Sequence, residues 1–241
     1  MRLAFISDIH GNANALEAVL EDIEERNIDK VYVLGDICYR GPEPKRSLDI
    51  VKSLNTEVIK GNADEWLIRG VRKGEVPEQA LNMMNLERDW ALTLLDETDI
   101  NYLKGLPTKM SLEFDGQKIV AFHATPNSLF DVVVPSEEDS IIQESLIIDE
   151  SADVFIYAHI HKPYIRYIKG KCVINTGSVG MPFDGLAKSS YAIVNIQNGN
   201  IHTTIVRVTF DIEQVVSKFQ ESDYPNKDLM INILKNGELP K

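Results

Sequence analysis

Seven side chains able to bind metal ions follow short apolar segments of this 241-residue sequence. They comprise two aspartates, one asparagine and four of the five histidines. Carboxylate and amide oxygens suit manganese or magnesium, whereas imidazole nitrogens suit zinc, iron and similar ions. Two ions held roughly 3.5–4 Å apart can clamp a phosphate and activate a water molecule, so the set indicates a two-metal hydrolase. The candidate ligands are Asp8, His10, Asp36, Asn62, His123, His159 and His161.

The spacing of these side chains favours shared binding of an ion. Asp8 and His10 are two residues apart, as are His159 and His161. On an extended segment, residues two apart point the same way, so each pair can bind an ion from one side. Asp36 carries two carboxylate oxygens and is therefore able to bridge two ions.

Alternating strands, loops and helices must position these ligands. The apolar run in Arg2–Ser7 predicts a strand buried on both faces, and Asn14–Arg26 has apolar residues at helical spacing. Ligands bind at the carboxyl ends of strands in α/β sheets, so we expect the seven side chains to meet at one edge. Gly35-Asp36 and Gly61-Asn62 are also common turn sequences, and the hypothesis therefore depends on this shared position.

The remaining elements follow from the same patterns. Helices are predicted at Pro44–Leu54, Glu138–Ile148 and Ile212–Gln220. Strands are predicted at Val31–Leu34, Glu57–Lys60, Met110–Phe114, Lys118–Phe122, Val154–Ala158, Tyr164–Ile168, Cys172–Asn175, Tyr191–Ile196 and His202–Val208.

Residues 65–109 differ from the rest because they contain helical patterns and no convincing strand. The segment is predicted to be a helical insertion or cap, either a wall over the active site or helices packed on a sheet. We expect a domain of residues 1–210 that contains this insertion, followed by a helical and partly mobile tail at 211–241.

Composition argues against several other classes of protein. The net charge of −12 gives no support for binding long nucleic acid, which requires a basic patch. Bound metals would supply the positive charge that an anionic substrate needs. Cys38 and Cys172 are far apart, which favours reduced thiols over a disulfide framework. Neither a signal peptide nor an apolar run of about 18 residues is visible, so we expect a cytoplasmic protein without membrane contact.

Taken together, the motifs resemble those of the calcineurin-like metallophosphoesterase superfamily. They occur in the family's order: Asp8-Ile-His10-Gly-Asn12, Gly35-Asp36, Gly61-Asn62-Ala-Asp64, His123-Ala-Thr-Pro126 and Ala158-His159-Ile-His161. The stretch Asn175-Thr-Gly177-Ser178-Val-Gly180 resembles the following loop in the small prokaryotic branch. The resemblance implies an α/β fold, a four-layer α/β/β/α sandwich of two packed mixed sheets with a helical cap insertion.

The resemblance also implies a role for each ligand. One metal would be held by Asp8, His10, Asp36 and His161, and the other by Asp36, Asn62, His123 and His159, with Asp36 bridging. Asp36, Asn62 and His123 would be the catalytic residues. The cofactors would be two divalent ions, manganese first, with Fe, Zn, Ni or Mg as alternatives. A hydroxide bridging the metals would attack phosphorus in line.

Two positions near the ligands bear on the substrate. Much of the superfamily has a histidine after the asparagine, where this chain has Ala63. That histidine usually helps the leaving group depart, so its absence favours a good leaving group, such as a nucleotide phosphate, over a simple alkyl phosphate. Arg40 follows the Asp36 loop and is either a bidentate ligand for a substrate phosphate or a solvated loop arginine.

The favoured function is hydrolysis of phosphodiester or phosphoanhydride bonds in a small nucleotide-like substrate, with diadenosine tetraphosphate as one candidate. The Arg40 loop, Ala63 and the insertion are similar to those of bacterial asymmetrical diadenosine tetraphosphate hydrolases. A protein Ser/Thr phosphatase is the alternative enzyme, because the Asp36-x-x-x-Arg40-Gly41 spacing is similar there too. A non-catalytic metal-binding scaffold of the same fold is the other alternative, and the complete ligand set argues against it. A homo-oligomer is compatible with the sequence.

Overall fold

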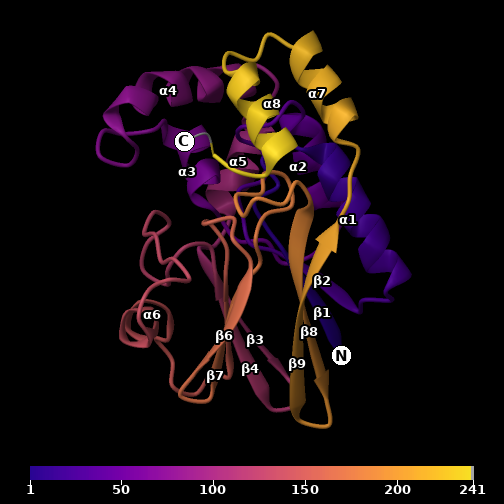
Figure 1. Ribbon diagram of the computed structural model, residues 1–241, viewed down its shortest axis with the longest axis vertical. Coiled ribbons are helices and arrows are strands. Elements are labelled where there is room, and N and C mark those ends of the chain that lie inside the picture. The colour runs from indigo at the N-terminus through magenta and orange to yellow at the C-terminus, as the bar shows by residue number, and fades with distance from the viewer. Residues whose placement is uncertain (240–241) are drawn as a thin grey trace.

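The computed structural model describes residues 1–239, which form two mixed β-sheets and eight α-helices (Figure 1). The strands are β1 (Arg2–Ile6), β2 (Lys30–Val33), β3 (Lys109–Phe114), β4 (Gln117–Phe122), β5 (Val154–Tyr157), β6 (Tyr164–Ile168), β7 (Lys171–Asn175), β8 (Ser189–Gln197) and β9 (Asn200–Val208). The helices are α1 (Ala13–Glu25), α2 (Pro44–Ser53), α3 (Asn62–Arg69), α4 (Glu78–Leu92), α5 (Glu97–Gly105), α6 (Asp139–Leu146), α7 (Ile212–Glu221) and α8 (Lys227–Asn236).

The first sheet has the order β2-β1-β8-β9 and the second the order β3-β4-β5-β7-β6. β1 pairs in parallel with β2 and antiparallel with β8. In the second sheet β4, β5 and β7 run parallel, while β3 and β6 pair antiparallel at the edges. The parallel strands of each sheet therefore present their carboxyl ends together.

Alternate residues of the central strands face different cores. Leu3 and Phe5 of β1 lie in the core between the two sheets, whereas Ala4 and Ile6 face the helices. The same alternation divides β5, whose Phe155 packs in a third core with α6. Three cores separate four layers, which confirms the predicted α/β/β/α sandwich.

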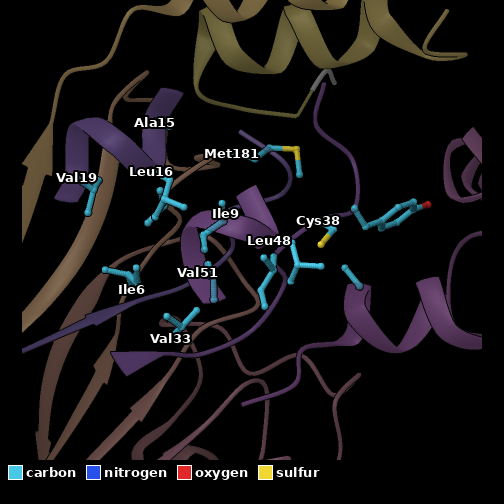
Figure 2. Packing of buried hydrophobic residues seen from close by; sticks show 14 of the residues in the cluster. Ile6, Ile9, Ala15, Leu16, Val19, Val33, Cys38, Leu48, Val51 and Met181 are labelled. Carbon is cyan, nitrogen blue, oxygen red and sulfur yellow. The ribbon is translucent and has the colours of Figure 1, made fainter. Parts of the chain in front are cut away.

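Most helices cover the first sheet, while α6 lies by itself beside the second (Figure 1). Figure 2 shows Leu16 and Val19 of α1 and Leu48 of α2 packed over Ile6 and Val33. Helices α3, α4 and α5 pack into the same core through buried residues such as Leu67. Packing of these helices on the first sheet is observed, whereas a role of residues 65–109 as a wall over the active site stays a prediction.

The strand predicted at Glu57–Lys60 is wrong. The segment makes a single bridge to β2, between Val58 and Val33. The backbone N–H of Lys60 donates instead to the carbonyl of Pro107, and α3 begins two residues later. The chain therefore turns away from the sheet before a ladder of hydrogen bonds can form.

The segment after residue 210 folds onto the helical layer instead of extending away from it. α7 and α8 bury Val215, Phe219, Met230 and Ile233 in the first core. Apolar residues at helical spacing explain this packing. The division of the chain at residue 210 stays a prediction, and residues 240–241 lie outside the described part.

No helix within residues 1–239 is both long enough and apolar enough to cross a lipid bilayer.

Replacing Ile233 by alanine tests the packing of α8. Removing a fully buried isoleucine is expected to lower the free energy of unfolding by about 2–5 kcal/mol. The measurement is urea unfolding of the full chain. Lys235→Ala is the matched control on the same helix, because its ion pair with Glu213 is largely exposed and should contribute less than about 1 kcal/mol. Equal effects of the two substitutions would show that α8 is not part of the core.

Candidate metal centre

The seven predicted ligands lie together in loops at the carboxyl ends of strands from both sheets. Asp8 and His10 follow β1, and Asp36 follows β2. From the second sheet, His123 follows β4, whereas His159 and His161 follow β5. Asn62 is the first residue of α3. The predicted convergence at one edge is therefore observed, and the two sheets share it.

Four of these side chains form one half of the site. One ligand atom from each of Asp8, His10, Asp36 and His161 lies within 4.8 Å of all the others, and all four residues are buried. Nε2 of His161 is 3.3 Å from Oδ1 of Asp8, and Nε2 of His10 is 3.6 Å from Oδ2 of Asp36. Two carboxylates and two imidazoles in this arrangement are a donor set for a divalent transition metal.

The other three ligands form a second half beside the first. Nε2 of His123 is 3.4 Å from Oδ2 of Asp36. The side-chain amide of Asn62 lies 2.8 Å from Nε2 of His123 and 2.7 Å from Nδ1 of His159. Asp36 thus contacts both halves, which is the position that a bridging ligand requires.

Backbone carbonyl groups fix the orientation of three histidine rings. Nδ1 of His10 donates to the carbonyl of Tyr39 at 2.9 Å, and Nδ1 of His123 donates to that of Leu34 at 2.6 Å. His161 makes the same contact with Met181. In its neutral form each ring is therefore the tautomer whose Nε2 lone pair faces the cluster, which is how metal-binding histidines are usually arranged.

Asp8 carries a buried oxygen that the protein leaves unsatisfied. The hydroxyl of Ser7 and the backbone N–H of His159 both donate to Oδ2. Oδ1 is buried and makes no hydrogen bond within residues 1–239. An orphaned carboxylate oxygen inside a protein is costly unless a cation compensates it. The residues present therefore fit a divalent metal ion.

The pKa values show how these charges interact. Burial alone would raise the pKa of Asp36, but the histidines around it, His123 first, lower it. Burial first, and then a neighbouring imidazole, lower the pKa of His10 and of His159 to about 4. Burial opposes the protonation of His123, yet Asp36 and Asp8 raise its pKa to about 9. The two carboxylates thus attract a positive charge to the centre of the cluster.

Asp64 positions Asp36 from behind. Its Oδ2 accepts from the backbone N–H groups of Asp36 and Gly61, both at 2.8 Å, and its Oδ1 accepts from that of Ile37 at 2.9 Å. Asp64 is the third residue of α3, so the same carboxylate caps that helix. This support depends on a contact between segments 28 residues apart, which the short motif did not reveal.

The ligand loops have an unusual backbone. Asp8, His10, Asp36, His159 and His161 all have φ between 50° and 66°, the left-handed region. Such conformations cost about 1–3 kcal/mol each and persist where the surroundings impose them. The glycines of the two short motifs lie against each other: a Cβ on Gly35 would be 2.2 Å from the nitrogen of Gly61. Neither glycine is therefore only a turn residue.

Arg40 is held by the insertion. Its Nε is 3.3 Å from Oε2 of Glu87 on α4, and its side chain is 16% exposed. The carboxylate of Glu87 is fully buried and also accepts from Asn226 at 2.6 Å, just before α8. Arg40 thus links the loop after β2 to α4 and the last helix. A contact between Arg40 and a substrate phosphate stays a prediction. Nothing in the sequence near Arg40 marked Glu87 as the partner of its ion pair.

Comparison with known proteins gives matches that span most of the chain. A family model described as the calcineurin-like phosphoesterase superfamily domain matches residues 1–199. An uncharacterised protein of Methanocaldococcus jannaschii is 29% identical, with 92% of this chain and 93% of that protein aligned. A symmetrical bis(5'-nucleosyl)-tetraphosphatase of Buchnera aphidicola is 31% identical over 65% of this chain, which spans about half (55%) of that enzyme.

Solved structures agree with the fold. A metallophosphoesterase from Sphaerobacter thermophilus has a TM-score of 0.77 and 25% identity, with 98% of this chain and 99% of that one aligned. A hypothetical protein from Pyrococcus horikoshii OT3 has a TM-score of 0.85 at 22% identity, with 99% of both chains aligned. The second likeness concerns the fold alone.

Metal binding should stabilise the folded protein through this cluster. Free Mn²⁺ at about 100 times its dissociation constant is expected to add about 2.7 kcal/mol to the free energy of unfolding. Thermal unfolding with and without Mn²⁺ measures the effect as a rise in Tm. Asp36→Asn keeps the side chain's size but removes its charge, so the rise should largely disappear. Asp89→Asn, on the exposed side of α4, is the control. The same rise in both variants would place the bound metal elsewhere.

Proposed function

The chain belongs to the calcineurin-like phosphoesterase superfamily, and on that premise we propose that it is a metal-dependent phosphoesterase that uses the seven-residue cluster. The proposal rests on one observation above all, the buried and unsatisfied Oδ1 of Asp8 among imidazole nitrogens that face it. A buried carboxylate oxygen in this state is suited to a bound cation such as a metal ion.

In this proposal the cluster holds two ions, and Asp36 is shared between them. Asp8, His10, Asp36 and His161 would hold the first, and Asp36, Asn62, His123 and His159 would hold the second. When bound, such ions supply positive charge to phosphoryl oxygens and lower the pKa of water.

The protein's own residues determine where a substrate reaches the site. Six of the seven ligands are buried, and His159 alone is partly exposed. A phosphoester therefore approaches from the side of His159. Buried walls around the other ligands exclude bulk water, which strengthens the electrostatic interactions inside.

Ala63 bears on the substrate class. Its backbone N–H donates to Oδ1 of Asp36 at 2.8 Å, so it helps orient the shared ligand. Its methyl group is fully buried and supplies no proton for a leaving group. This supports a substrate whose leaving group departs readily, such as a nucleoside phosphate.

The named relatives support the same class. Several curated relatives are symmetrical bis(5'-nucleosyl)-tetraphosphatases, whereas the sequence motifs resemble those of asymmetrical enzymes. Both names describe enzymes that act on dinucleoside tetraphosphates. We therefore propose a nucleotide-like phosphodiester or phosphoanhydride as substrate, with diadenosine tetraphosphate as the first to test.

The activity is tested with purified protein, Mn²⁺ and bis-para-nitrophenyl phosphate. Wild-type protein is expected to release para-nitrophenol, and Asp36→Asn should lower kcat by at least about 10³-fold because both metals lose a ligand charge. Asp89→Asn should retain wild-type turnover. Unchanged turnover in Asp36→Asn would refute the assignment of the site.

The same assay separates the alternatives. A scaffold would show the Mn²⁺-dependent rise in Tm without hydrolysing any phosphoester. A protein phosphatase would prefer phosphoserine or phosphothreonine peptides over dinucleoside polyphosphates in a substrate panel with product identification.

A further inference from the structure

A groove of about 480 Å³ opens beside the metal cluster, in the size range of small-molecule sites. His159 lines it, and His159 is also the one partly exposed ligand of the cluster. The groove therefore continues from the side on which a substrate approaches. A phosphoryl group at the metals would leave the rest of its molecule facing this space.

The walls of the groove are largely apolar although they are open to solvent. Val132 is 65% exposed and Leu239 is 51% exposed. Val134 and Ile160 line the same groove. Exposed apolar side chains that gather around one hollow commonly mark a binding site. These residues come from three distant parts of the chain, so the fold and not a local motif assembles them.

An aromatic ring connects the groove to the cluster. Phe183 lines the groove and also stacks on the ring of His161, with centroids 4.3 Å apart and planes at 14°. One surface of Phe183 thus packs against a metal ligand while another borders the hollow. Planar aromatic groups bind well against such a ring, and a nucleobase is a planar group of this kind.

Two charged side chains also line the groove. Lys162 follows the ligand His161 directly and is exposed. Glu238 lies in the same lining and repels phosphate. Lys162 is therefore the positively charged residue of the lining that lies next to the ligand loop, where a leaving phosphate would meet it.

We propose that this groove binds the nucleoside phosphate that leaves during hydrolysis, with its base against Phe183 and the valines and its phosphate beside Lys162. The proposal rests on the phosphoesterase function and adds a substrate class and a place for the leaving group. The Lys162 ammonium would then provide the positive charge near the leaving group that Ala63 does not provide.

Hydrolysis in this arrangement needs water as its one further reactant. The oxygen of water forms a bond to phosphorus, and the P–O bond to the leaving nucleoside phosphate breaks. The leaving oxygen keeps the electron pair and its negative charge lies near the Lys162 ammonium. The proton released from water passes to solvent.

Ligand binding tests the groove without turnover. In Mn²⁺-loaded protein, AMP is expected to bind about tenfold more tightly than ribose 5-phosphate, because the base alone uses the apolar walls. Val132→Asp, which places a charge in the groove, should remove that preference. Ile148→Asp is the matched control, an apolar residue 45% exposed but outside the groove. Isothermal titration calorimetry measures all six affinities, two ligands for each of three proteins. Equal affinity of the wild type for both ligands, or equal effects of the two substitutions, would overturn the proposal.

Leaving-group dependence tests Lys162. Lys162→Met is expected to lower kcat for dinucleoside polyphosphates about tenfold or more, and Lys162→Arg should restore most of the loss. The loss should grow as the leaving phenol becomes more basic across a series of substituted phenyl esters of methyl phosphate, in which the phenolate takes the place of the leaving nucleoside phosphate. A uniform loss for all esters would indicate a structural role and refute the assignment of Lys162. If the wild type hydrolyses no phosphoester, the proposed function fails, while the AMP preference still decides whether the groove binds nucleosides.

Discussion

The structure depends on the burial of two carboxylates, Asp8 and Asp36, within reach of one another. Two like charges in a low-dielectric interior repel strongly unless a cation lies between them. The high pKa of His123 shows how strongly the pair attracts a positive charge, and the unsatisfied Oδ1 of Asp8 shows that protein groups do not neutralise it completely. A divalent metal resolves both problems, so the electrostatics of the site and its proposed chemistry have the same origin.

The sandwich holds these charges together because each sheet contributes ligands from its strand ends. Backbone hydrogen bonds then join the ligand loops directly: the N–H of His10 donates to the carbonyl of Asp36, and that of Gly180 donates to the carbonyl of Asp8. Such contacts between loops compensate the left-handed conformations of the ligands. The core between the sheets keeps the ligand loops of the first sheet at a fixed separation from those of the second.

Much of this arrangement was predictable because apolar runs and ligand residues alternate along the sequence. The strand before Asp8 and the helix after it are local patterns, and their prediction was confirmed. The segment Glu57–Lys60 was mispredicted, since its sequence suits a strand but its hydrogen bonds lead elsewhere. Glu87 and Phe183 were not identified because each acts on a residue far away in sequence. The metal ligands themselves remain a prediction from motifs that the geometry supports.

The pairing of β1 has a consequence for the time at which the site can form. Phe5 pairs with Ala192, so β1 acquires its second neighbour only after most of the chain has been made. At ribosomal speeds of about 5–20 residues per second, the interval is on the order of 10–40 s. Contacts so distant in sequence also slow folding itself, since a long loop must close first. Asp8 and His10 are thus synthesised well before the strand that completes the surroundings of β1. A metal ion that needs the complete cluster would therefore be captured only after β8 has been synthesised.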